Sequence, residues 1–417
     1  MTDLLPRWAL VRQRLDAAAI GDVRAAVRAA LEPVLGELGS GRRVALAVGS
    51  RGIDRIDEVV RAAVERIRET GATVFIVPAM GSHGGATAAG QLAVLAEYGI
   101  TPAAMGCEIR SSMDTVELGE VSTGVPVHFD RAAFEGADAI VPINRINVHT
   151  DFDGPVQSGL LKMIAIGLGK QRGADTFHRQ GFETFADLVP AVAAFTLARA
   201  PIPFGIALVE NGLARLQLIE AIPAARLRAR ESDLLALAAA SLARLPLDRI
   251  DVLVIDRIGK DISGLGMDSN VTGRWFHGAT GAPPAIQRIV ARGLTDRTEG
   301  NAAGVGMADV VLRRLVDRID PARMYLNSIT AKTPEGSRIP MTVDTDREAL
   351  SVALACCVRV TPETARMVRA LDTKHLEHLY VSEPALDAVL ATGRCVVEEP
   401  AHPIRFDADG MLAETFR

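Results

Sequence analysis

The sequence predicts an α/β protein with two domains, each built on a mostly parallel sheet, and an active site in the cleft between them. Short apolar stretches alternate with amphipathic helical stretches, which is the pattern of a parallel sheet covered by helices. The length of 417 residues also favours more than one domain. A new strand pattern begins near residue 250 after a long helical pattern. We therefore expect an N-terminal domain of residues 1–246 and a C-terminal domain of residues 247–417 that closes the cleft.

Composition argues against several classes of function. Hydrophobic residues make up 48% of the chain and charged residues 23%, as in an ordinary soluble enzyme. The net charge of −5 and the pI near 6.0 offer no attraction for nucleic acid or for an anionic membrane. The N-terminus lacks a signal-peptide pattern and no apolar run reaches membrane-spanning length, so we expect a cytoplasmic protein. The cysteines are too scattered for a paired metal site.

The first half of the chain shows strand and helix patterns in alternation. A Gly-rich stop follows most of the apolar stretches, which places element boundaries there. His128, flanked by apolar residues, is expected to be structural. The expected elements are helices over residues 22–38 and 56–70, strands at residues 44–48, 74–77 and 139–143, and a small β excursion within residues 105–130.

Polar side chains follow these strands at their carboxyl ends, where parallel sheets bind ligands. Arg51 comes after the first strand and His83 after the second, so we expect the two to lie near each other. Alone, each has an ordinary explanation, a surface ion pair for Arg51 and a loop histidine satisfied by backbone for His83. Asn147 and His149 follow the strand at residues 139–143 and are expected at the same edge of the sheet. The sequence thus predicts a ligand crevice there.

The stretch of residues 149–178 begins and ends with a histidine and contains Lys162. Most lysines are solvated surface charges. Here an apolar run at residues 163–166 follows at once, and an amine desolvated in such surroundings has a lowered pKa and becomes nucleophilic. Gly167 and Gly169 could admit a phosphate close to backbone amides. They do not follow a strand as in a dinucleotide-binding unit, so we predict no such fold from them.

The second half of the chain continues the alternation. A Gly-rich segment at residues 257–274 is expected to form the opposite wall of the cleft, with Asp268, Asn270 and Arg274 as ligand candidates. Helix caps and turn formers are the alternative interpretation of these three residues. The expected elements are strands at residues 205–209, 250–255, 308–315 and 352–359, helices at residues 223–245, 362–371 and 383–391, and a loop at residues 330–336 that carries Lys332.

Several of these segments resemble the lactate racemase family, whose members use a nickel-pincer nucleotide tethered to a lysine. Gly81-Ser82-His83 resembles the family's Gly-Thr-His segment, and Arg51 occupies the place of its substrate-binding arginine. Ser-Gly-Leu-Leu-Lys at residues 158–162 resembles the family's Ser-Gly-Gly-Arg-Lys. His178 falls where the family has its nickel-binding histidine, and His149 matches the second catalytic histidine.

The resemblance implies a racemase or epimerase of a 2-hydroxy acid that works by reversible hydride transfer to the cofactor. Such a route needs a base for the hydroxyl proton of each enantiomer, and His83 and His149 are the implied bases. Arg51 is implied to hold the substrate carboxylate through its planar guanidinium. The implied partners are the small-molecule substrate and the enzymes that synthesise the cofactor.

The resemblance also implies how the cofactor is held, which makes residues 1–246 the cofactor-binding catalytic domain. Lys162 would be the covalent anchor, and His178 would bind nickel through a neutral imidazole. The other cofactor-binding residues implied are Ser158, Gly159, Gly167 and Gly169.

The sequence departs from the lactate racemase pattern at positions near the substrate. Val48 stands where lactate racemases tend to carry Asp, and Leu-Leu replaces Gly-Arg before Lys162. Gly-Lys-Asp-Ile at residues 259–262 resembles a Pro-Lys-Asp-Ile stretch of the family, but a different continuation follows it. We therefore expect a 2-hydroxy acid other than lactate. The residues expected to shape its pocket are Asn147, Asp268, Asn270, Arg274 and Lys332.

Two other classes of function remain open at this point. A zinc- or iron-dependent hydrolase or lyase could use His83, His149 and His178 as metal ligands and would not need Lys162. A non-catalytic binding protein could keep the fold without the chemistry. Such a protein would be expected to lose a histidine or the lysine first, and all of them are present.

Overall fold

The computed structural model of the chain describes residues 5–49, 52–150, 152–276 and 284–416 and divides into two units. The N-terminal unit comprises Ala17–Leu242 together with Thr330–Lys332. The C-terminal unit comprises the rest of the chain after Leu242 and the segment that precedes Ala17. Both are α/β units with mostly parallel sheets, as the sequence predicts. Within the described ranges no helix is both long enough and apolar enough to cross a bilayer.

The N-terminal unit is built on a five-stranded sheet in the order β3-β2-β6-β7-β8. All neighbours are parallel except β7 and β8. The central strands are almost wholly buried, as expected where helices cover both faces of a parallel sheet. The strands predicted in this half of the sequence are therefore confirmed. Their bounds are β2 (Arg43–Val48), β3 (Thr73–Pro78), β6 (Ala139–Arg145), β7 (Phe204–Glu210) and β8 (Leu216–Pro223).

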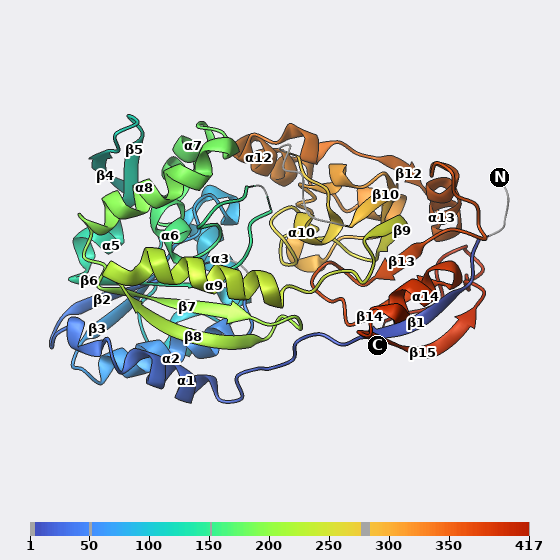
Figure 1. Cartoon of the computed structure of the whole chain (residues 1–417). Coiled ribbons are helices and arrows are strands. Elements are labelled where there is room, and N and C mark those ends of the chain that lie inside the picture. Colours follow the sequence, from blue (N-terminus) through green and yellow to red (C-terminus); the bar gives the residue numbers. More distant parts are fainter. Residues whose placement is uncertain (1–4, 50–51, 151, 277–283, 417) are drawn as a thin grey trace. The chain divides into compact units, whose positions relative to one another are not determined.

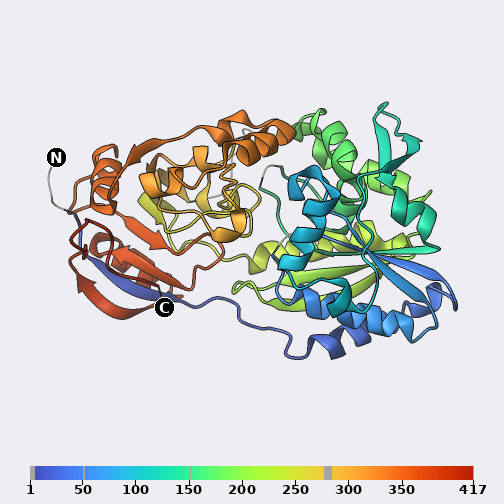
Figure 2. The ribbon, with the colours of Figure 1, turned by 180° about the vertical axis from the view of Figure 1, so that it is seen from behind.

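Helices cover the two faces of this sheet (Figures 1 and 2). α1 (Val23–Leu31) and α2 (Ile56–Arg68) pack on one face, and α8 (Phe185–Leu197) and α9 (Leu227–Ser241) pack on the other. The helices predicted here are present, with α1 and α9 shorter than expected. The smaller elements are α3 (Ala88–Glu97), α4 (Pro102–Met105), α5 (Arg131–Gly136), and the antiparallel pair β4 (Thr115–Glu120) and β5 (Pro126–Asp130), which is the expected β excursion.

The start of α1 illustrates how local chemistry sets these bounds. The Asp22 carboxylate accepts a hydrogen bond from the N–H of Ala25 at 2.9 Å, which satisfies a donor that the first helical turn leaves open. Val23, Val27 and Leu31 then fall on one face and are buried. Periodicity and cap together therefore place the helix start where the sequence predicts it.

The C-terminal unit is built on an eight-stranded sheet in the order β12-β11-β10-β9-β13-β14-β1-β15. The first five strands are parallel, and the last three pair antiparallel. The strands are β9 (Arg249–Ile255), β10 (Ala285–Ala291), β11 (Val310–Leu312), β12 (Met341–Val343), β13 (Met367–Ala370), β14 (His378–Ser382), β15 (Cys395–His402) and β1 (Trp8–Gln13). The helices are α10 (Ser269–Thr272), α11 (Arg313–Val316), α12 (Pro321–Ala331), α13 (Asp346–Ala355) and α14 (Glu383–Ala391).

The N-terminal strand β1 belongs to the C-terminal unit. It lies between β14 and β15 and pairs with both. Trp8, at its start, is 1% exposed and stacks on Tyr380 with ring centroids 5.0 Å apart. The sequence division assigned these residues to the N-terminal domain, because a strand pattern says nothing about which sheet a strand joins.

Two local predictions in the C-terminal half were wrong. Residues 352–359, predicted as a strand, lie in and after α13, which Thr345 caps by accepting the N–H of Glu348 at 3.1 Å. Residues 362–371, predicted as a helix, contain β13, which is held between β9 and β14. Pairing on both sides decides the second case, since strand formation depends on neighbours more than on local pattern. The helix predicted at residues 383–391 is confirmed as α14.

Replacing Trp8 tests the place of β1. We expect Trp8→Ala to lower the free energy of unfolding of the C-terminal unit by about 3–5 kcal/mol, because the ring is fully buried. The other tryptophan of the sequence, Trp275, also belongs to this unit and reports its unfolding by fluorescence in urea. Val397→Ala, at a 43% exposed position of β15, is the control with little expected change. An unchanged midpoint for Trp8→Ala would contradict the assignment.

Candidate functional site

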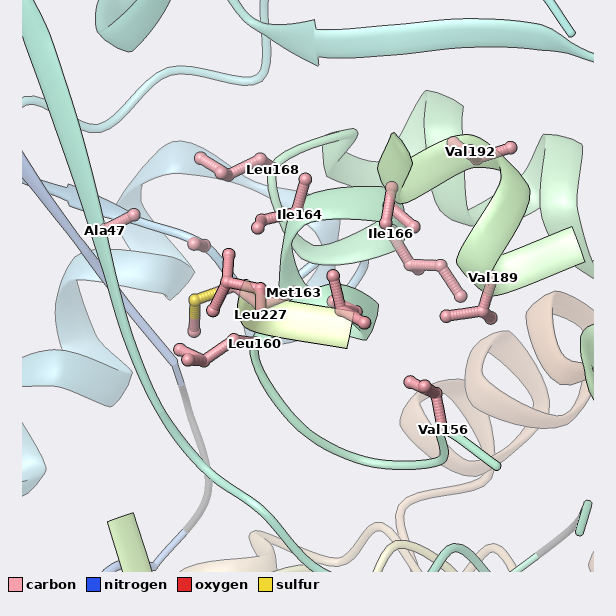
Figure 3. Close-up of a cluster of buried hydrophobic side chains, with 14 of the residues drawn as sticks. Ala47, Val156, Leu160, Met163, Ile164, Ile166, Leu168, Val189, Val192 and Leu227 are labelled. Carbon is pink, nitrogen blue, oxygen red and sulfur yellow. The ribbon is translucent and has the colours of Figure 1, made fainter. Parts of the chain in front are cut away.

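Lys162 ends α6 (Leu160–Lys162), a single turn that continues into a π-helix, η3 (Met163–Gly167), and then into α7 (Lys170–His178). π-Helices are rare and are frequent at functional sites. η3 is buried among apolar side chains that include Ala47 of β2 and residues of α8 and α9 (Figure 3). Lys162 itself is half-buried. The burial that the sequence predicts after Lys162 is present, but periodicity did not reveal the π-helix.

Two side chains from distant elements hold the turn before Lys162. The carbonyl of Gly159 accepts a hydrogen bond from Nδ2 of Asn144, at the end of β6, at 2.9 Å. The N–H of Leu161 donates to Oε2 of Glu231, on α9, at 3.0 Å. A Cβ on Gly159 would lie 2.4 Å from Oε1 of Glu231, so a larger residue would displace the carboxyl group. Gly159 thus has a packing role beside Lys162.

Glu231 is a member of the site that the sequence analysis missed. It is 1% exposed, and burial raises its pKa to about 7. The N–H groups of Leu161 and Leu160 counter part of this rise, because they stabilise the carboxylate. The signal was present in the sequence, since Glu231 falls on the same buried helical stripe as Leu227 and Leu234. A carboxylate on an apolar stripe needs partners from elsewhere in the fold.

His149 meets Lys162 in the structure. The Nζ atom of Lys162 contacts Nε2 of His149, which is 5% exposed and lies on the loop after β6. The base of this loop is closed by two backbone hydrogen bonds between Asn147 and Ser158, at 2.8 and 3.1 Å. The turn to His149 is therefore fixed at both ends by backbone pairing. Two of the residues singled out by the sequence are brought into direct contact.

An aromatic cluster connects Lys162, His149 and His178. The ring of Phe152 lies 4.4 Å from the ring of His149 and 5.7 Å from Nζ of Lys162. The ring of Phe182 lies 6.4 Å from the ring of His149 and 5.2 Å from that of His178. These apolar surroundings disfavour charge on the amine and on both imidazoles. The three predicted residues therefore share one aromatic wall.

His83 lies on the loop after β3 and is exposed. The loop is attached to the π-helix, because the N–H of Gly81 donates to the carbonyl of Gly167 at 3.0 Å. A Cβ on Gly167 would lie 2.6 Å from the carbonyl oxygen of Ala79, so the approach depends on glycine. The His83 loop and the segment after Lys162 therefore lie side by side. Arg51, predicted beside them, lies outside the described residues.

A buried ion pair that sequence reasoning missed supports the His83 loop. Lys170 is fully buried, and its Nζ lies 2.7 Å from Oδ2 of Asp130, which is fully buried too. The same amine donates to the carbonyl of Pro78 at 2.6 Å and to Oε1 of Gln91 at 3.3 Å. Gln91 in turn donates to two carbonyls of the His83 loop, at 2.9 and 3.4 Å. The network fixes where β3 ends and the loop begins.

The glycines predicted to bind the cofactor have packing reasons in this structure. A Cβ on Gly169 would lie 3.0 Å from Cα of Gly173 and 3.2 Å from the carbonyl oxygen of His128. These glycines let α7 approach β5 closely. Burial lowers the pKa of His128, and Arg172 lowers it further, which fits its expected structural role. Cofactor contacts of Ser158, Gly159, Gly167 and Gly169 stay predictions.

The residues predicted in the C-terminal unit contact their own segment. Asp268 caps α10 and accepts the N–H of Asn270 at 2.8 Å. Arg274 donates to the carbonyl of Met307 at 2.7 Å and forms an ion pair with Asp309 at 2.6 Å. These contacts order the Gly-rich segment. A role of the three residues in binding substrate stays a prediction.

Lys332 clusters with the N-terminal unit, and its Nζ lies 3.1 Å from Oδ1 of Asp175. Asp175 is on α7, the helix that ends with His178. In the part of the chain that the structure describes, no group of three or more His, Cys, Asp or Glu side chains is arranged to hold a metal ion. A metal bound at His178 would therefore need donors other than such a cluster.

Comparison with solved structures gives two similar folds. The lactate racemase apoprotein from Thermoanaerobacterium thermosaccharolyticum matches with a TM-score of 0.51 and 12% identity, over 88% of this chain and 99% of that one. A protein from Thermotoga maritima matches with a TM-score of 0.50 and 14% identity, over 67% and 72% of the two chains. The likeness is one of fold. No protein-family model matches the sequence, and no curated protein matches it.

The Lys170 network yields a test of stability. We expect Lys170→Met to lower the free energy of unfolding by about 3–5 kcal/mol, because it leaves the Asp130 carboxylate buried without its cation. The same exchange at the 41% exposed Lys332 should cost less than about 1 kcal/mol. Urea unfolding followed by circular dichroism measures both. Equal effects of the two substitutions would refute a structural role for the buried pair.

Glu231 yields a test of pH dependence. The folded state raises the pKa of Glu231 from 4.5 to about 7, so it binds more protons than the unfolded state between these values. The free energy of unfolding should therefore fall as the pH rises through this window. Glu231→Gln removes this dependence and should gain on the wild type by up to about 3 kcal/mol between pH 4.5 and 8.

The matched control for this pH test is Asp233→Asn, a 69% exposed carboxylate on the same helix. Its difference from the wild type should not change with pH in this window. Urea midpoints at a series of pH values give both curves. A Glu231→Gln curve that runs parallel to the wild type would show that the carboxyl group titrates normally.

Proposed function

We propose that the chain is a divergent member of the lactate racemase family, a racemase or epimerase of a 2-hydroxy acid that carries a nickel-pincer nucleotide on Lys162. The observation that carries the proposal is the contact of the Lys162 amine with His149 on the aromatic wall that also holds His178. The lactate-racemase-like fold supports it.

The side chains present fit this cofactor. Lys162 offers a half-buried amine in apolar surroundings, which favour the neutral, nucleophilic form. His178 offers an imidazole, a ligand type that suits nickel. Because the described residues present no three-ligand cluster, the remaining donors would come from the cofactor itself. When bound, such a group takes up a hydride from the α-carbon of the substrate and can return it to either face.

The protein's own residues would then move the proton and hold the substrate. His149 and His83 are proposed as the bases that take the hydroxyl proton, one for each enantiomer. Attachment of the cofactor converts the Lys162 amine to an uncharged, amide-like nitrogen. This removes a competing positive charge next to Nε2 of His149, which can then accept the substrate proton. Arg51 is proposed to bind the carboxylate through its planar guanidinium.

The proposed substrate is a 2-hydroxy acid other than lactate. Val48, at the position where lactate racemases tend to carry Asp, is fully buried at the end of β2 and offers no polar group. In this proposal the N-terminal unit holds the cofactor, and cofactor-synthesis enzymes supply it. The residues proposed to shape the pocket are Asn147, Asp268, Asn270, Arg274 and Lys332.

The experiment is co-production with the cofactor-synthesis enzymes, followed by intact mass and metal analysis. We expect a nucleotide-sized adduct on Lys162 and about one nickel per chain in the wild type, and neither in Lys162→Ala. Lys374→Ala is the control and should retain both. With the adduct present, screening of 2-hydroxy acids by chiral chromatography identifies the substrate.

A different result would favour another class of enzyme. Zinc or iron bound equally by the wild type and by Lys162→Ala, with no adduct in either, would overturn the cofactor proposal. It would support a metal-dependent hydrolase or lyase that uses the histidines alone.

A further inference from the structure

The turn that carries Lys162 is too short to hold itself in place. α6 has a single turn, and a helix start leaves its first N–H groups without partners in the helix. The residue before it, Gly159, has no side chain to cap them. Glu231 takes this role from α9, 70 residues further along the chain. Its carboxyl group accepts the N–H of Leu161, the residue directly before Lys162.

We propose that Glu231 is the positioning residue for Lys162. By holding the amides of α6 from below, it keeps the amine against His149 and Phe152 rather than in solvent. The proposal deepens the proposed function, since it rests on Lys162 being the cofactor anchor. Glu231 acts through the backbone of its neighbours and does not take part in chemistry.

The clamp around Lys162 has two sides. Asn144 holds the carbonyl of Gly159 while Glu231 holds the N–H of Leu161, so the peptide units on either side of Leu160 are fixed. Gly159 leaves the space that the carboxyl group fills. Removing Glu231 would leave buried N–H groups without an acceptor, which costs more than exchanging one acceptor for another.

Charged residues on the elements around α9 have other partners. Glu220, on β8, pairs with Arg230 at 2.8 Å. Glu210, on β7, pairs with Arg145. The contacts that tie Glu231 to its surroundings are instead the amides of α6, where it pays the cost of burial. A carboxyl group kept in this place is explained by the turn it supports.

The test is trace acetylation with acetic anhydride of the protein without cofactor, followed by peptide mapping. The readout is labelling of Lys162 relative to Lys332, which is 41% exposed. Glu231→Ala should loosen the turn, expose the amine and raise this ratio about tenfold. Glu231→Gln keeps an acceptor oxygen and should stay within about twofold of the wild type. Asp233→Ala, on the exposed face of α9, should leave the ratio unchanged.

The fully buried Lys170 reports whether a variant has kept its fold, because it should stay unlabelled. If Glu231→Ala labels Lys170, Glu231→Leu replaces it, since leucine keeps the packing volume and lacks an acceptor. A folded Ala or Leu variant with the wild-type ratio would overturn the proposal. So would a Gln variant that labels as strongly as that variant.

The adduct on Lys162 after co-production separates this inference from the proposed function. If both hold, Glu231→Ala gives less adduct than the wild type although its amine is labelled more readily by the small reagent. An absent adduct in the wild type with the expected labelling ratios would remove the cofactor proposal and leave the positioning role intact. A normal adduct with unchanged ratios would do the reverse.

Discussion

Burial of the segment around Lys162 is the constraint on which the site depends. The chain from Gly159 to Lys170 runs through the core between the sheet and the helices α8 and α9, where water cannot satisfy backbone groups. Its polar atoms are instead partnered from afar, by Glu231 and Asn144 before the lysine and by the Gly81 loop after it. The same partners that make the burial possible also fix where the amine stands.

The site combines a rigid base with groups whose charge is held down. Lys162, His149 and His178 meet an aromatic wall, which disfavours the charged form of each. His83 differs from them because it is exposed on its loop. An amine and two imidazoles kept from full solvation suit covalent attachment and metal binding better than they suit stability, since apolar side chains would pack the same wall at lower cost. Function is the simpler explanation for retaining them.

Sequence reasoning succeeded where a local pattern carries the information. The order of strands and helices in the first half, the buried run after Lys162, and the edge of the sheet at which His83 and His149 emerge all follow from periodicity and the rule for parallel sheets. It failed for β13, which resembles a helix by itself and becomes a strand between two neighbours. It also passed over Glu231, although a carboxylate on an apolar helical stripe was visible in the sequence.

The sequence by itself determined the α/β class, most elements of the N-terminal sheet, and the chemistry of the residues that gather at its carboxyl edge. Tertiary structure alone decided that β1 joins the sheet of the C-terminal unit, that Lys162 touches His149, and that Lys170 is a buried structural cation rather than a surface one. The reason is physical. Periodicity records which face of an element is buried, but pairing of a strand, contact of two side chains and compensation of a buried charge each depend on a partner far away in the chain.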